Sequence, residues 1–220
     1  MATGLDVIKV AENELGVVEG PRVNEVKYND WYYRQNVYGT QFPWCMAFVQ
    51  WVYSQAGAAL PHQTASCGEL LRWYKKYHPE CIVDHPVAGD IVIFDLPGGS
   101  ATDHAGLFVR FDGDMILTID GNTGYTNNSN GGQVLKRKRD TKYVAAYIHP
   151  NELQEDDAMI YYESIAEISK NAPWATEAVT WMYNNDIVRG VKEGDEVKGL
   201  HLSEDMLRML VFMYRLYTVW

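Results

Sequence analysis

The stretch that decides the fold is Phe42-Pro43-Trp44-Cys45-Met46-Ala47-Phe48-Val49, in which a cysteine follows a proline at the expected start of a helix. Apolar residues recur beyond Cys45 at the spacing of a helix face that packs on a core. They are Val49, Val52 and Ala56. The Cys45 thiol is thus expected in the first helical turn, where unpaired backbone N–H groups and the helix dipole favour the thiolate. Cys45 is a candidate nucleophile, and the alternative is a small buried apolar residue, as most free cysteines are.

The composition narrows the class of protein. The chain has 220 residues and 47% hydrophobic content, which suits one medium-sized domain and a small second one. A formal net charge of −10 argues against nonspecific binding to nucleic acid or to anionic membranes. Three cysteines, Cys45, Cys67 and Cys81, are too few for a disulfide framework and are typical of a reducing compartment. No apolar run approaches the roughly 18 residues that cross a bilayer, and residues 1–6 lack the pattern of a signal peptide.

Residues 104–122 are predicted to form a β-hairpin. Two alternating segments, His104–Phe111 and Met115–Asn122, flank the turn residues 112–114. If the loop holds all three turn residues, His104 lies opposite Asn122, and Asp120 is its diagonal neighbour on the same face. A two-residue loop would send Asp120 and Asn122 to the other face. A site that needs these side chains together therefore predicts the three-residue turn.

These residues fit the chemistry of a thiol hydrolase. A cysteine that attacks an amide needs a base within hydrogen-bond reach, and the base needs a polar partner that fixes its tautomer and stabilises its charged form. The hairpin offers His104 as the base and Asp120 or Asn122 as the partner. A lone histidine is usually structural, but two polar residues on its face favour the catalytic interpretation. The order Cys45, His104 and then Asp or Asn is that of papain-like hydrolases.

Four ordered motifs in about the first 150 residues resemble the CHAP family, which comprises cysteine- and histidine-dependent amidohydrolases/peptidases common in phage endolysins and bacterial autolysins. The motifs are Gln41–Trp51, Gly89–Phe94, Asp103–Leu107 and Ile119–Thr123. The resemblance implies an α+β, papain-like fold in which N-terminal helices pack on an antiparallel sheet. It also implies peptidoglycan as the substrate, cut at the sugar-to-alanine amide or within the stem peptide or cross-bridge.

The resemblance further implies the roles of the site residues. Cys45 is the nucleophile, His104 is the general base and then acid, and Asp120 is the orienting acid at a position where the family often has Glu. Asn122 supports the imidazole or the substrate. Residues 17–44 are expected to form an aromatic loop that lines a sugar or peptide groove or, alternatively, covers the core. Trp44 and Gln41 are therefore candidate substrate-binding residues, and Gln41 or the Cys45 backbone N–H is a candidate oxyanion donor.

We expect no metal and no other cofactor. Some family members carry an Asp-rich calcium loop just before the nucleophile, but residues 36–42 contain no carboxylate. The cysteines and histidines between positions 67 and 85 form no tight Cys-x-x-Cys pair, so they are interpreted as scattered residues and not as a zinc site. The one basic run, Lys136–Arg139, is interpreted as the solvated face of a strand.

The C-terminal residues are predicted to be helical. Pro173 opens one helix, and Ser203 caps another that has a wide apolar stripe. Residues 174–179, 185–190 and the helix after Leu202 resemble one S-layer-homology (SLH) repeat, a motif that binds wall polymers in other proteins. Ser203-Glu204-Asp205-Met206 replaces the usual Thr-Arg-Ala-Glu signature. Wall binding therefore competes with docking on the catalytic domain and with self-association into a homo-oligomer.

The sequence as a whole predicts a CHAP catalytic domain at 1–150, a linker at 151–157 and a small all-helical module at 158–220. The expected function is that of an endolysin-type peptidoglycan hydrolase with a Cys-His-Asp/Asn thiol mechanism. It is expected to be made in the cytoplasm of a phage-infected bacterial host and to act on the cell wall after release. The alternatives are a papain-like amidase with another peptide substrate and a catalytically inactive wall-binding protein.

Overall fold

The computed structural model describes residues 2–97, 102–113, 115–126, 130–154, 161–194 and 196–218. The chain divides into two compact units, Met1–Asp156 and Asp157–Trp220. The end of the predicted linker, residues 155–157, lies outside the described residues. Within the described ranges, no helix has the length and apolar character that a membrane span requires.

The first unit is built on an antiparallel six-stranded sheet with the strand order β1-β6-β2-β3-β4-β5. The strands are β1 (Ile82–Val83), β2 (Ile91–Phe94), β3 (His104–Asp112), β4 (Met115–Thr123), β5 (Gln133–Asp140) and β6 (Val144–Ile148). All four residues of β2 are buried, which explains its continuous apolar run. Ile91 and Ile93 join the larger core on one face, while Val92 and Phe94 join a smaller cluster on the other.

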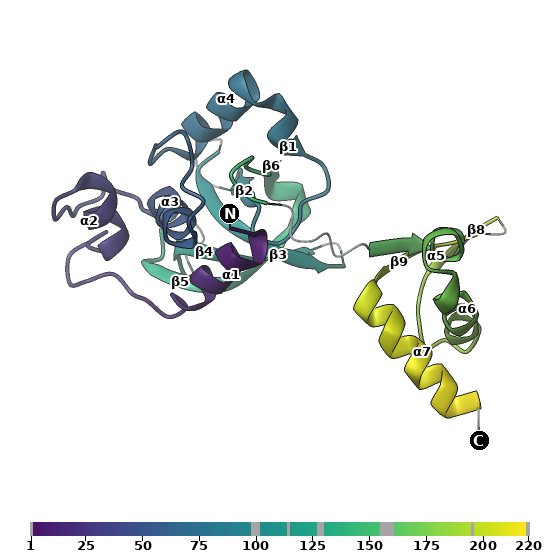
Figure 1. Cartoon of the computed structure of the whole chain (residues 1–220). Coiled ribbons are helices and arrows are strands. Elements are labelled where there is room, and N and C mark those ends of the chain that lie inside the picture. Colours follow the sequence, from purple (N-terminus) through teal and green to yellow (C-terminus); the bar gives the residue numbers. More distant parts are fainter. Residues whose placement is uncertain are drawn as a thin grey trace. The chain divides into compact units, whose positions relative to one another are not determined.

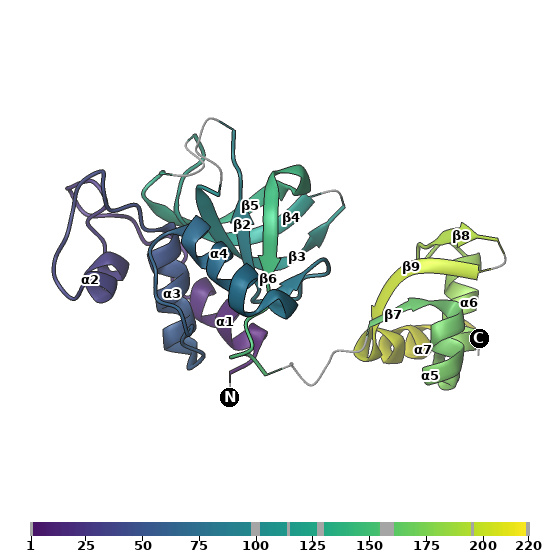
Figure 2. The same ribbon diagram turned by 90° about the horizontal axis from the view of Figure 1, so that it is seen from above.

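Helices cover one face of this sheet. They are α1 (Gly4–Glu12), α2 (Lys27–Tyr33), α3 (Cys45–Ala56) and α4 (Cys67–Tyr77), with short 3-10 turns η1 (Pro79–Cys81) and η2 (Thr141–Tyr143). α3 lies between α2 and the sheet in both ribbon views (Figures 1 and 2). Its residues 45–50 are all buried, so α3 is the central helix of the core. The antiparallel sheet with packed helices confirms the predicted α+β class.

Side-chain caps mark the starts of α1 and α4. The side chain of Thr3 accepts a hydrogen bond from the N–H of Asp6 in a capping box, and Ser66 caps α4 by accepting from the N–H of Glu69. The region 17–44 differs from the expected loop, because it contains α2. Tyr28 of α2 is fully buried, and burial of this residue stabilises a short helix that the surrounding turn residues obscure in the sequence.

The second unit contains the predicted helices and, in addition, a sheet. Its elements are β7 (Tyr161–Ser164), α5 (Ile165–Asn171), η3 (Pro173–Ala175), α6 (Thr176–Asn184), β8 (Val191–Glu193), β9 (Glu196–Ser203) and α7 (Glu204–Thr218). The strands pair in the order β7-β9-β8, and α5 and α7 both pack against β9 (Figure 2). This corrects the expectation of an all-helical module. The strands are short and charged. Among the described side chains, Tyr162 of β7 and Val197, Leu200 and Leu202 of β9 reach the core, so the periodicity of the strands is weak in the sequence.

Candidate active site

Cys45 is the first residue of α3, as the sequence predicts. The preceding Trp44 makes no side-chain cap in the described structure, and the positive end of the helix dipole lies at the Cys45 side chain. α3 packs closely on β4 because Gly121 has no side chain. A Cβ atom at position 121 would lie 2.6 Å from Cβ of Phe48. The glycine thus sets how near the helix approaches the sheet.

The β3–β4 hairpin has the predicted pairing near His104, but its turn length differs from the predicted one. Asp112 pairs with Met115, so two residues separate the strands, and the expected three-residue turn is wrong. The register then shifts between Phe108 and Arg110, and Gly106 pairs with Asp120. One extra residue in β3 therefore compensates for the shorter turn. His104 and Asp120 remain diagonal neighbours on one face, as the chemistry requires.

His104 and Asp120 form a buried pair. Nε2 of His104 lies 3.0 Å from Oδ2 of Asp120, and both side chains are fully buried. Gly106 leaves room for the carboxylate, because a Cβ atom there would overlap Oδ1 of Asp120. A carboxylate is an acceptor only, so Nε2 carries the proton that it donates to Asp120. Nδ1 of His104 has no hydrogen-bond partner among the described residues and is the nitrogen left for the thiol.

Arg139 of β5 forms a buried ion pair with Asp120. Its Nε donates to Oδ2 of Asp120 over 3.0 Å, its Nη2 donates to the same oxygen, and Nη2 lies 3.2 Å from Oγ1 of Thr123. Burial by itself raises the pKa of Asp120, but the charge of Arg139 and the hydrogen bond from His104 outweigh burial and lower the pKa to about 2. Arg139 is 4% exposed and so departs from the expected solvated face, while Lys136 and Lys138 of the same run are exposed as expected.

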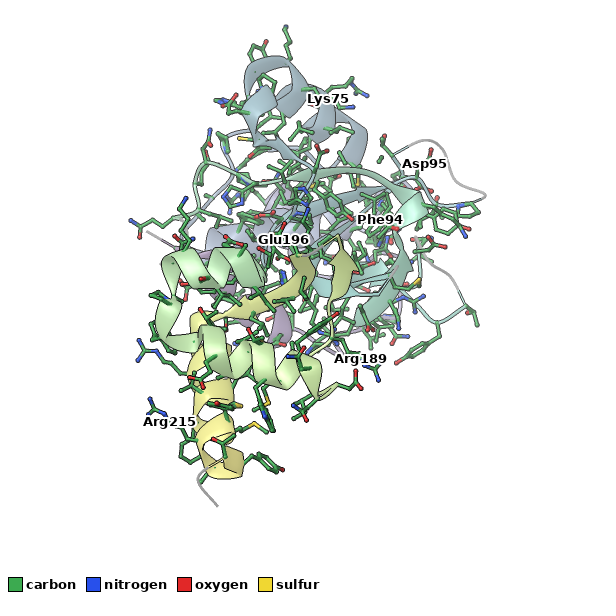
Figure 3. The ribbon with its side chains drawn as sticks, turned by 90° about the vertical axis from the view of Figure 1, so that its right-hand side faces the viewer. Lys75, Phe94, Asp95, Arg189, Glu196 and Arg215 are labelled. Carbon is green, nitrogen blue, oxygen red and sulfur yellow. The ribbon has the colours of Figure 1, made fainter. Side chains whose placement is uncertain are left out.

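The electrostatics couple Cys45 to His104. Burial lowers the pKa of His104, but Asp120 and the thiolate of Cys45 raise it to about 9. The pKa of Cys45 is well below that of an ordinary thiol, because the Cys67 thiol donates to it and His104 also stabilises the thiolate, against the opposing effect of burial. Phe94, which is labelled in Figure 3, is the last residue of β2, and its ring lies 6.0 Å from the His104 ring, centroid to centroid. The site therefore favours a thiolate–imidazolium pair.

Cys67 is the unexpected member of the site. It is the first residue of α4, and its Sγ lies 3.7 Å from Sγ of Cys45. Burial and the neighbouring Cys45 thiolate raise the pKa of Cys67 well above the usual thiol range, the hydrogen bond to Cys45 being the largest cause. Cys67 is therefore the protonated partner, and its S–H donates to the Cys45 sulfur.

The remaining predicted site residues lie elsewhere. The side chain of Asn122 donates to Oδ1 of Asn130 over 3.1 Å and accepts from the N–H of Gly132 over 3.3 Å, so it holds the chain after β4 and does not contact the imidazole. Trp44 is fully buried, with its ring 5.3 Å from that of Tyr28. This placement corrects the expected substrate contact of Trp44, because its ring packs in the core.

Gln41 is exposed and lies against Gly39, four residues before the nucleophile. Its place on the surface near the start of α3 is compatible with substrate contact, which stays a prediction. In the described part of the chain, no three His, Cys, Asp or Glu side chains gather as metal ligands would.

Two of these residues were not identified in the sequence. Alternation along β5 places Arg139 on the same face as Arg137 and Leu135, and Arg139 pairs across the sheet with the buried Ile116. This alternation was the sequence feature from which the position of Arg139 could have been predicted. For Cys67 the corresponding sequence feature was Ser66. Serine is preferred at helix N-caps, so Ser66 predicts a helix that begins at Cys67, just as Pro43 and Trp44 precede the helix that begins at Cys45.

A helix that begins at a cysteine and packs on an antiparallel sheet carrying a His–Asp pair is consistent with a papain-like fold. Comparison with protein families finds a CHAP domain at residues 37–122. The matched residues include Cys45, His104 and Asp120. CHAP domains are generally hydrolase domains that act on peptidoglycan, so the match indicates amidase or peptidase activity on peptidoglycan as a general class. No curated protein matches the chain.

Proposed function

We propose that the protein is an endolysin-type peptidoglycan hydrolase in which Cys45 attacks an amide carbonyl of the bacterial cell wall. The observation that supports this proposal best is that the two nitrogens of the His104 ring have different surroundings. Nε2 is bound to Asp120, and Nδ1 is left for the thiol. An imidazole held in one tautomer beside a thiolate is the arrangement that nucleophilic cysteine catalysis requires.

In the acylation step the Cys45 thiolate adds to the carbonyl carbon of the scissile amide. The negative charge moves to the carbonyl oxygen, for which the Cys45 N–H and Gln41 are the proposed donors. The tetrahedral intermediate collapses as His104 gives its Nδ1 proton to the leaving amine. The C–N bond breaks, and the acyl group remains on Cys45 as a thioester.

In the deacylation step neutral His104 takes a proton from water through Nδ1, and the resulting hydroxide adds to the thioester carbonyl. Collapse breaks the C–S bond and releases the carboxylic acid, while Cys45 leaves as a thiolate. His104 keeps the proton, so the thiolate–imidazolium pair is restored. Throughout the cycle, Asp120 holds the ring by Nε2 and stabilises its positive charge.

The proposal is tested with purified full-length protein and peptidoglycan fragments. The unsubstituted protein is expected to clear the fragments and to release new amino and carboxyl termini. Cys45→Ala should do neither, and Cys81→Ala, a buried cysteine of η1, should act as the unsubstituted protein does. Equal clearing by the Cys45→Ala variant would end the thiol mechanism. The chemical identity of the new termini decides between the sugar-to-alanine amide and a bond in the stem peptide or cross-bridge.

For the second unit we propose self-association through α7, with wall-polymer binding by its SLH-like repeat as the competing role. The inner face of α7 packs through Leu207 and Val211, but its outer face carries exposed apolar side chains. They are Met206, Met209, Phe212, Leu216 and Tyr217. A helix with apolar residues on both faces is typical of a helix that contacts a partner, such as another apolar helix.

A further inference from the structure

We propose that Cys45 and Cys67 are a redox pair, in which a hydroperoxide oxidises Cys45 and Cys67 then closes a reversible disulfide that switches the hydrolase off. The inference rests on the proposed function, because it uses the same reactive thiolate. It adds a modification site and a form of regulation that the hydrolytic mechanism does not need.

The geometry brings two helix starts together at the sulfur atoms. Cys45 begins the 12-residue helix α3, and Cys67 begins the 11-residue helix α4. Their Sγ atoms are 3.7 Å apart, and the two residues are 3% and 5% exposed. A disulfide is about 2.05 Å long, so the sulfurs must approach by about 1.7 Å, a shift within the range of small side-chain rotations. In the sequence the cysteines are 22 residues apart, so the bond would close a loop and join α3 to α4.

The two thiols differ in reactivity. Both face the positive end of a helix dipole, but Cys45 also has the His104 imidazolium beside it and is the deprotonated member of the pair. Cys67 is the protonated donor. Since the thiolate is the form that peroxides oxidise, Cys45 reacts first. The Cys67 sulfur lies 3.7 Å from the sulfur that is oxidised and is placed to act as the resolving thiol.

The chemistry proceeds in two balanced steps. The Cys45 thiolate attacks one oxygen of a hydroperoxide and breaks the O–O bond; this gives Cys45 sulfenic acid and, after protonation, water or an alcohol. Cys67 then attacks the sulfenic sulfur, the S–O bond breaks, and the hydroxyl leaves as water with the Cys67 proton. The thiols lose two electrons in total, and the hydroperoxide gains them. A small dithiol reverses the process by thiol–disulfide exchange.

Two consequences follow for the enzyme. The disulfide removes the nucleophile, so hydrolysis stops while the fold stays intact. It also consumes the sulfenic acid before a second peroxide can form the sulfinic acid, which small thiols do not reduce. Cys67 therefore converts an irreversible inactivation into a reversible one.

The test uses the reduced full-length protein, treated with hydrogen peroxide and then mapped by mass spectrometry after blocking of free thiols. The unsubstituted protein is expected to yield a cross-linked peptide joining Cys45 to Cys67, to lose its activity, and to regain it with dithiothreitol. Cys67→Ala and Cys67→Ser should form no cross-link. After prolonged treatment with excess peroxide, which carries an unprotected sulfenic acid on to the sulfinic acid, neither variant should recover its own starting activity. Cys81→Ala is the matched control and should behave as the unsubstituted protein does.

Conversion of Cys45 to sulfinic acid in the unsubstituted protein, with Cys67 still free, would overturn the redox pair. Full recovery of both Cys67 variants by dithiothreitol after the same prolonged treatment with excess peroxide would do the same. A lack of activity before any peroxide is added counts against the proposed hydrolase instead, and the peptide map then still decides whether the pair forms.

Discussion

At the scale of single residues, the Asp120 carboxylate is hydrogen-bonded to two positively charged side chains, the imidazolium of His104 and the guanidinium of Arg139. It accepts from His104 and from Arg139 through the same oxygen, Oδ2. Arg139 keeps the carboxyl ionised inside the core, and the carboxylate in turn keeps the imidazole charged and fixed in one tautomer. The catalytic pair therefore depends on an arginine that has no direct contact with the substrate in the proposed mechanism, which makes Arg139 a positioning residue.

Asp120→Asn keeps the shape of the site and removes its negative charge. The pKa of His104 should fall, and the wrong tautomer becomes accessible to the ring, so we expect kcat to drop at least about 100-fold. Wall hydrolysis gives kcat, and NMR titration of the His104 ring protons gives the pKa. An unchanged pKa of His104 in the variant would contradict the assigned role of the carboxylate.

Arg139→Met should destabilise the first unit, because it removes the guanidinium that pairs with the buried Asp120 carboxylate. Breaking one side of a buried ion pair typically lowers the free energy of unfolding by about 3–5 kcal/mol. The matched control is Lys138→Met on the same strand. Lys138 is half exposed and pairs with Asp112 over 2.9 Å, and loss of such a surface pair costs about 0–1 kcal/mol. Urea denaturation measures the free energy of unfolding of both variants. Equal losses in the two variants would show that burial of the Asp120 carboxylate does not depend on Arg139.

The pH dependence of activity follows from the two shifted pKa values. The pKa of Cys45 is lowered, so the thiolate is present above this lowered value and is lost as the pH falls through it. The pKa of His104 is raised to about 9, so the imidazolium is present below this pH and is lost as the pH rises through it. We expect kcat/KM to form a broad plateau that includes neutral pH and to fall near pH 9. A decline that begins near 6.5, the value of an ordinary histidine, would contradict the pairing.

At the scale of secondary structure, we expect the close approach of α3 to β4 at Gly121 to determine whether Cys45 reaches His104. Gly121→Ala would force Phe48 and the helix away from the strand. We expect a loss of about 1–3 kcal/mol in the free energy of unfolding together with a loss of activity. Gly20→Ala is the control, because a Cβ atom there meets only the flexible end of the Glu25 side chain. If Gly121→Ala kept full activity, the close approach would not be what positions the nucleophile.

The hairpin also shows how far the sequence could predict the site. Alternation and the Asp-Gly turn identified both strands, and chemical reasoning placed His104 and Asp120 on one face. The predicted turn length was wrong, because the compensating extra residue near Val109 has no signal in an alternating apolar run. Arg139 and Cys67 were missed because each belongs to an element distant in sequence, and only tertiary packing brings β5 and α4 to the site.

At the scale of the whole molecule, the exposed stripe of α7 should govern association. Phe212 is 62% exposed, and Arg215, labelled in Figure 3, follows it by three residues in the same helix. Phe212→Ser should shift the molar mass measured by light scattering from a self-associated form to the monomer. Tyr125→Ser, which removes an exposed aromatic side chain of the first unit, should leave the mass unchanged. Wall binding would be favoured instead if the unsubstituted protein is monomeric and sediments with wall fragments, and if Phe212→Ser abolishes this sedimentation.

The most direct test of the account is the rate at which iodoacetamide alkylates Cys45 as a function of pH, followed by peptide mapping so that the other cysteines do not contribute. A thiolate held by Cys67 and His104 should react at a nearly constant rate from alkaline pH to well below neutrality. Cys67→Ala should move the onset to higher pH, and Cys67→Ser should restore part of the shift, because a hydroxyl can also donate. A Cys45 rate that rises only near the pKa of an ordinary thiol, about 8.5, would contradict the thiolate–imidazolium pair.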